Sequence, residues 1–191
     1  MIITVNTTVN RWMHRDLSSK NVMVDNHGYG KLIDVGLAKK VKENEHTYTI
    51  AGTPIYYAPE LIKSTGYGHK AEIWALGVLL YELFAGAAPF MPPANSTKKG
   101  NARRLELYDK IVKEDPSFHL AAFHDQKTGH MGDAARDLIG RCLRKKASDR
   151  VSIPQMRTSV FYQGFNWQAF HNKQIRPPYL PKPNPSLPNP R

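Results

Sequence analysis

The chain has 191 residues, of which 41% are hydrophobic, which suits one globular domain or one large part of a bigger domain. A single cysteine, Cys142, excludes an internal disulfide framework and favours a reducing compartment, so we expect a cytoplasmic protein. The N-terminal residues lack the basic start and the long apolar run of a secretory signal peptide.

The 27 basic and 16 acidic residues give a net charge of +11, which is compatible with a nucleic-acid partner, with an anionic membrane surface or with solvated helix faces. The basic residues are scattered over several segments, with no interleaved aromatic residues and no finger motif. They include Lys98–Lys99, Arg103–Arg104, Arg141 and Arg144–Lys146. This scatter favours solvated helix faces and no nucleic-acid partner.

Residues 21–25 and 31–35 are predicted to form two short strands, because both runs are rich in apolar and β-branched residues. Residues 26–30 between them contain asparagine and two glycines, a composition typical of a tight turn. The resulting hairpin would bring Asn21 close to Asp34. The polar run 37–55 that follows is predicted to be a loop.

Three helices are predicted from apolar periodicity. The first covers residues 70–85; the apolar run 73–90 around it contains Glu82, Gly77, Gly86 and Pro89 and is short for a membrane span, so we predict a buried core helix. The second starts near Arg103, and its apolar residues are Leu105, Tyr108, Ile111 and Val112. The third follows a cap at Asp133 and contains Ala135, Leu138, Ile139 and Cys142, where the cysteine is a core residue and not a nucleophile.

Two segments have compositions that disfavour regular structure. Residues 92–101 are rich in asparagine, lysine, glycine and proline and are predicted to be an insertion before the second helix. Residues 176–191 are dense in proline, so we predict an extended, partly polyproline segment.

Three motifs follow one another in the first third of the chain. His14-Arg15-Asp16 is followed five residues later by Asn21, then comes Asp34-Val35-Gly36, and then Ala58-Pro59-Glu60. Each motif alone is weak, but their order and spacing resemble the catalytic machinery of eukaryotic protein kinases. The resemblance implies an α+β fold of the protein-kinase type, with a mainly α-helical large (C-terminal) lobe and a short β hairpin.

The resemblance also implies a chemistry, which is transfer of the γ-phosphoryl group of ATP to a serine or threonine hydroxyl of a protein substrate. Asp16 would be the catalytic base, and Thr53 would be a catalytic-site residue that contacts Asp16. Asn21 and Asp34 would be the Mg²⁺ ligands. Structural roles would fall to His14, Glu60, Glu72 and Arg150, with Glu60 and Arg150 forming a buried ion pair, and Glu82 would be a substrate contact.

The loop before Ala58-Pro59-Glu60 is similar to the activation loop of the cyclic-nucleotide-dependent kinases, and Thr49 matches their regulatory phosphosite. A phosphate there would add about −1.5 to −2 charges. Arg15 matches its partner, with Lys40 as a second cation. The alternative is that Thr49 is an ordinary loop residue.

Near the C-terminus, Gly164-Phe165-Asn166-Trp167 and the later Pro177–Pro181 run resemble the tail of AGC-type kinases, especially the cGMP-dependent ones, in which the tail wraps back onto the small lobe. A proline-rich ligand for a recognition domain is the alternative. The resemblance divides the chain into an N-terminal remnant (1–10), a partial kinase domain (11–162) and a tail (163–191).

The chain departs from the family pattern at several positions. The thirteen residues before His14 are too few for a glycine-rich loop and an ATP-binding lysine, so we expect the small lobe to be missing and the fragment alone to be inactive. Ser18 stands where the family has a lysine, and Val35 where it has a phenylalanine. Glu72 stands where the family has an aspartate, and the extra methylene of the glutamate would strain its hydrogen bonds. Lys20 and Ile55 stand where related kinases have glutamates that bind substrate arginine. The alternative function is a non-catalytic fragment or pseudokinase that acts through protein interaction. Expected partners are a protein substrate, ATP, and a regulatory domain or an upstream kinase.

Overall fold

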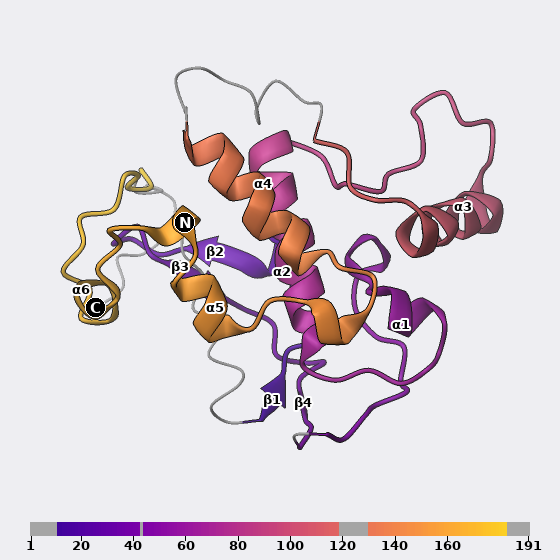
Figure 1. The fold of residues 1–191 in the computed structure, drawn as a ribbon, viewed down its shortest axis with the longest axis horizontal. Helices are drawn as coiled ribbons and strands as arrows, with labels where there is room; N and C mark the ends of the chain where they lie inside the picture. The colour runs from indigo at the N-terminus through magenta and orange to yellow at the C-terminus, as the bar shows by residue number, and fades with distance from the viewer. Residues whose placement is uncertain (1–10, 43, 119–129, 183–191) are drawn as a thin grey trace.

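The computed structural model describes residues 11–42, 44–118 and 130–182, and the remnant 1–10 and residues 183–191 of the tail lie outside these ranges. The described part is rich in helices and contains two small antiparallel sheets, β1–β4 and β2–β3 (Figure 1). In chain order the elements are β1 (Trp12–Met13), η1 (Ser19–Asn21), β2 (Val22–Val24), β3 (Gly30–Leu32), β4 (Lys39–Lys40), η2 (Pro54–Tyr56), α1 (Pro59–Ile62), α2 (Lys70–Ala85), α3 (Gly100–Lys113), α4 (His130–Cys142), η4 (Ala147–Asp149), α5 (Ile153–Arg157), η5 (Val160–Tyr162) and α6 (Trp167–His171).

Helix α2 is the centre of the fold, and its bounds are those predicted from the sequence. Residues 71–81 are all buried, which is the pattern of a helix that is surrounded by protein on every side. The helix ends at Gly86, whose φ of 73° is in the left-handed region that glycine tolerates best. Within the described ranges, no helix has the length and apolar character needed to cross a bilayer.

Helix α4 packs along α2 in the middle of the molecule (Figure 1). The approach is close at Gly77, where an added Cβ would lie 2.6 Å from the Cβ of Cys142. Cys142 is fully buried, and burial raises the pKa of its thiol to about 12, so the prediction of a core cysteine is confirmed. The other predicted core residues of this helix, Ala135, Leu138 and Ile139, are also buried.

Two predicted helix starts were wrong by about one turn. Helix α3 begins at Gly100, and α4 begins at His130, so Asp133 lies in the first turn and is not the cap. There its carboxylate contacts the Arg136 guanidinium one turn later. In α3 the buried residues are Leu107 and Ile111, whereas Leu105 is 65% exposed.

The predicted hairpin is present as β2–β3, but both strands are shorter than the predicted 21–25 and 31–35, and the second ends before Asp34. The register pairs Val22 with Leu32 and Val24 with Gly30. Pairing extends beyond the strands, because the Ile33 N–H donates to the Asn21 carbonyl over 2.8 Å. The turn is closed by Asp25, whose carboxylate accepts the backbone N–H of Tyr29 at 2.9 Å. This bond is the main reason that the pKa of Asp25 lies below its usual value.

The C-terminal segment packs on the turn of this hairpin. The Tyr29 hydroxyl donates to the Ile175 carbonyl over 2.7 Å, and the Tyr29 and Phe170 rings lie 5.7 Å apart. Gly28 has a φ of 81°, and a Cβ there would lie 2.5 Å from the Tyr179 carbonyl. Of the predicted extended segment 176–191, residues 176–182 are described, and they form no helix or strand and contain a bend at Pro178. The short helix α6 before this segment was not anticipated.

Candidate active site

Asp16 is held by two side chains from different parts of the chain. The Asn21 Nδ2 donates to the Asp16 Oδ2 at 2.9 Å and to the Asp16 carbonyl at 2.8 Å. The Thr53 hydroxyl donates to Asp16 Oδ1 at 2.7 Å. Because both oxygens are hydrogen-bonded, the half-buried carboxylate has a fixed orientation. The structure thus brings Asp16, Asn21 and Thr53 together, as the family resemblance implied.

The loop that carries Asp16 is fastened to the central helix by Glu72. Its two carboxylate oxygens accept the backbone N–H of Arg15 at 2.9 Å and of His14 at 3.3 Å. The longer side chain therefore reaches both donors, with one ordinary and one long bond. Burial raises the pKa of Glu72, and the two backbone N–H groups act in the opposite direction.

His14 links this loop to Asp34. Its Nε2 lies 3.0 Å from the Ile33 carbonyl, directly before Asp34. Because a carbonyl only accepts, Nε2 must carry the proton in this contact. Asp34 is exposed and has a φ of 60°, and its Oδ1 accepts the Gly36 N–H at 3.2 Å. Such a backbone conformation is uncommon outside glycine, although aspartate and asparagine tolerate it best.

Asn21 and Asp34 offer the kind of donor atoms that Mg²⁺ prefers, and the Ile33 N–H, directly before Asp34, donates to the Asn21 carbonyl at 2.8 Å. The Asn21 Nδ2 makes both of its bonds to Asp16, and within the described ranges the amide oxygen has no bond that would prevent it from binding a metal. Asp34 adds carboxylate oxygens, and oxygen donors are what Mg²⁺ prefers. The described ranges hold no group of three or more histidine, cysteine, aspartate or glutamate side chains that would bind a metal alone. Two protein ligands suit an ion whose other ligands are phosphate oxygens and water.

The segment that contains Thr49 passes close to Asp16. At Gly52, with a φ of 100°, any Cβ would overlap the Arg15 carbonyl, so glycine permits the close approach. Thr49 is exposed, and its carbonyl accepts the Tyr67 hydroxyl at 2.6 Å. Thr47 is buried, and its hydroxyl accepts a hydrogen bond from the Lys39 ammonium at 3.1 Å. The cation bound to this segment is therefore Lys39, whereas the sequence analysis named Lys40.

Arg15 lies next to this segment without touching Thr49. Its Nε donates to the Leu37 carbonyl at 2.6 Å. The guanidinium also approaches the Tyr67 hydroxyl and opposes the rise in the pKa of Tyr67 that burial causes. Within the described part of the chain no bond joins Arg15 to the Thr49 hydroxyl, so the predicted pair is separated by Tyr67 in this unphosphorylated chain.

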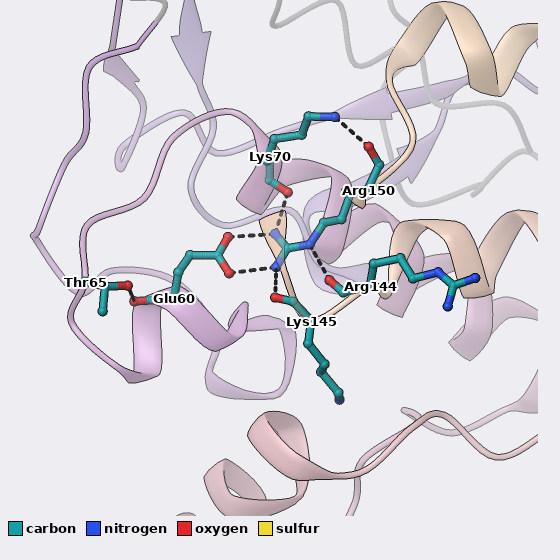
Figure 2. Close-up of polar contacts among 6 residues, drawn as sticks. All are labelled: Glu60, Thr65, Lys70, Arg144, Lys145 and Arg150. Carbon is teal, nitrogen blue, oxygen red and sulfur yellow. Dashed lines mark hydrogen bonds and ion pairs between the residues drawn. The ribbon is translucent and has the colours of Figure 1, made fainter. Parts of the chain in front are cut away.

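The predicted ion pair between Glu60 and Arg150 is present and buried (Figure 2). Two parallel bonds of 2.6 and 2.7 Å join the guanidinium to the carboxylate. The remaining three N–H groups of Arg150 donate to the carbonyls of Lys70, Arg144 and Lys145. All five donors are therefore used, and the Trp74 ring lies 5.0 Å from the guanidinium carbon.

Glu82 is engaged by protein groups that the sequence analysis did not identify. The Tyr56 hydroxyl contacts its Oε2, and the Ser19 hydroxyl donates to its Oε1 at 3.3 Å. No local pattern marks these hydroxyls, because the three residues come from separate segments.

Two positions at which the chain departs from the family pattern differ in their environments. Ser18 is buried, and its hydroxyl has no hydrogen-bond partner in the described ranges, whereas Val35 is 68% exposed.

The chain matches the protein kinase domain family model over residues 9–162. It is 31% identical over 173 residues to the cGMP-dependent protein kinase, isozyme 1, of Drosophila melanogaster and 31% identical over 175 residues to the cAMP-dependent protein kinase catalytic subunit of Dictyostelium discoideum. It is also 32% identical over 179 residues to the protein kinase C-like 1 of Caenorhabditis elegans. These alignments cover 88%, 89% and 90% of this chain but 20%, 24% and 23% of those proteins. By its sequence match and by the arrangement around Asp16, the chain belongs to the protein kinase family.

Proposed function

We propose that the chain carries the phosphoryl-transfer residues of a serine/threonine protein kinase. The observation that supports this most directly is the Asp16 carboxylate, which is oriented by Thr53 and Asn21. In this proposal Asp16 accepts the proton of the substrate hydroxyl, while Asn21 and Asp34 hold the metal. Bound Mg²⁺ would neutralise charge on the phosphates of ATP.

We further assign the chain to the AGC type, as the large lobe and tail of a kinase domain. The resemblance of its tail and its similarity to the cyclic-nucleotide-dependent kinases support this assignment. Catalysis would also need a segment that covers the nucleotide from the other side, whereas the strand pairs of the described ranges are β1–β4 and β2–β3. As part of this proposal, the 191 residues alone would transfer phosphate very slowly.

The test is transfer of labelled phosphate from Mg²⁺-ATP to a mixed protein substrate, followed by identification of the modified amino acid. It uses the protein as its own gene expresses it, with Asp16→Asn as the blank. Label on serine or threonine that disappears in Asp16→Asn supports the proposal. Label on tyrosine contradicts the specificity. Nucleotide binding without Asp16-dependent transfer favours the alternative of a pseudokinase that acts through protein interaction.

We also propose that Thr49 is a regulatory phosphosite. Its exposure, and the position of Arg15 behind Tyr67, support a phosphate that would recruit the guanidinium through charge-assisted bonds. Because Arg15 precedes Asp16, this contact would couple loop order to the catalytic carboxylate. Buried Thr47 supplies a control, since a kinase cannot reach its hydroxyl without opening the segment.

We expect an upstream kinase to phosphorylate Thr49, and we expect the phosphorylated protein to be protected from proteolysis within residues 44–55. Arg15→Gln should abolish the protection but not the labelling. Label on Thr47, or equal protection in Arg15→Gln, would contradict the switch. The measurement is limited proteolysis of phosphorylated and unphosphorylated protein with mass spectrometry.

A further inference from the structure

Helix α2 carries a second carboxylate near the catalytic loop, that of Glu82, and it is already hydrogen-bonded within the protein. Both oxygens of Glu82 face hydroxyl groups, one from Tyr56 and one from Ser19. The Tyr56 hydroxyl in turn accepts the Ser19 N–H at 3.0 Å, so the three residues form a closed network. A cationic side chain of a substrate would have to compete with two hydrogen bonds to this carboxylate, which are charge-assisted because the acceptor is ionised.

An exposed cation lies directly beside this network. Lys20 follows Ser19 in the short helix η1, between Asp16 and Asn21. Its backbone is held in place because the flanking Ser19 N–H and the Asn21 side chain are both hydrogen-bonded. Lys20 has no ion-pair partner in the part of the chain that the structure describes. Its exposed charge is therefore not neutralised by another residue of the described ranges.

A second exposed cation borders the same surface from helix α3. Arg104 precedes Tyr108 by four residues, which places both on one face of the helix. The Tyr108 ring lies 6.2 Å from the ring of Tyr57. Tyr57 donates to the Gly52 carbonyl at 2.9 Å, next to the Thr53 that holds Asp16. Arg104 is near enough to lower the pKa of Tyr57 against the effect of burial, and it too has no ion pair in the described ranges.

From this geometry we infer that the surface around Asp16 selects protein segments in which acidic residues flank the acceptor hydroxyl, with Lys20 and Arg104 as the cations that meet them. The inference rests on the proposed function, because it names the substrate class of that site. Two unpaired cations attract carboxylates and repel lysine and arginine, while Glu82 is held by hydroxyls. The same arrangement disfavours basic substrates.

Binding of labelled peptides to the purified chain tests this without catalysis. Three peptides share a central serine and differ in having glutamate, glutamine or lysine on both sides of it. Fluorescence anisotropy at an ionic strength of about 0.15 M, where the Debye length is about 8 Å, gives each Kd. We expect the acidic peptide to bind at least about 10-fold more tightly than the basic one. Lys20→Glu and Arg104→Glu should each reduce or reverse this ratio.

Matched charge reversals on the C-terminal segment, Lys173→Glu and Arg176→Glu, control for the net charge of the chain, because both residues are exposed. They should leave the ratio within about 2-fold of the parent, since exposed charges farther apart than a Debye length are screened. Equal losses in all four variants, or tighter binding of the basic peptide, would overturn the inference. The double variant Ser19→Ala/Tyr56→Phe removes the two hydroxyl partners of Glu82 and should bind the basic peptide more tightly. An unchanged affinity for that peptide would contradict the role given to these two hydroxyls.

Transfer assays with the same peptides separate this inference from the proposed function. Selective binding of the acidic peptide without Asp16-dependent transfer would contradict the kinase assignment and leave the selectivity intact. Asp16-dependent transfer that favours the basic peptide would do the reverse. An RNA oligonucleotide that competes with the acidic peptide, and loses affinity in the same two variants, would point to a nucleic-acid surface and overturn the inference.

Discussion

Replacing Arg150 by leucine is expected to lower the free energy of unfolding by about 3–5 kcal/mol, the typical cost of removing one partner of a buried ion pair. The side chain of Arg150 is 0% exposed and that of Glu60 is 14% exposed. The variant would leave the Glu60 carboxylate without its cation and three backbone carbonyls without their donor. Urea unfolding followed by circular dichroism measures the difference.

Arg144→Leu is the matched control for this prediction, because the Arg144 side chain is exposed and only its carbonyl takes part in the network. It should change stability by no more than about 0.5 kcal/mol. Combining Arg150→Leu with Glu60→Met should cost less than the two single changes added together, since the pair then disappears as a unit. A loss below about 1 kcal/mol for Arg150→Leu would mean that the ion pair is not held as the structure has it.

The parts of the fold that the sequence predicted well are those with local signals. Helix α2 could be bounded because its apolar run is interrupted by Gly86, whose positive φ stops a helix. The β2–β3 hairpin could be located because residues 26–30 have the asparagine and glycines of a tight turn, and Gly28 there has a positive φ. Both features depend on neighbours within a few residues, so a single sequence suffices.

The parts that could not be predicted depend on partners that are far apart in the chain. The Tyr29 hydroxyl meets the Ile175 carbonyl across 146 residues, and no pattern near either residue announces this contact. The occupation of Glu82 by Ser19 and Tyr56 is of the same kind. The pairing of Asp16 with Thr53 was anticipated because of the family resemblance and not because of any local spacing.

The second large effect is expected at Asp34, where Asp34→Asn should lower the phosphoryl-transfer rate by about 100-fold or more. Asparagine tolerates the φ of 60° at this position and keeps an oxygen for the Gly36 N–H, so the backbone has little reason to move. What the change removes is the negative charge that would hold Mg²⁺ against the phosphates. The measurement is the initial rate of transfer as a function of Mg²⁺ concentration, on the protein as its gene expresses it.

Asp137→Asn on α4 is the control for Asp34→Asn, since this exposed carboxylate pairs only with Arg141 in the described part of the chain, at 3.5 Å. Its rate should equal that of the parent. If Asp34 is a metal ligand, the Asp34→Asn variant should require more Mg²⁺ for half-maximal rate, because a ligand without charge binds the ion less tightly. If Asp34→Asn has the parental rate and the parental Mg²⁺ dependence, Asp34 is not a metal ligand. Asn21 would then be the one remaining protein ligand of the two proposed. A slow variant with unchanged Mg²⁺ dependence would instead assign Asp34 to the placement of the loop after Ile33, which His14 already holds through its carbonyl.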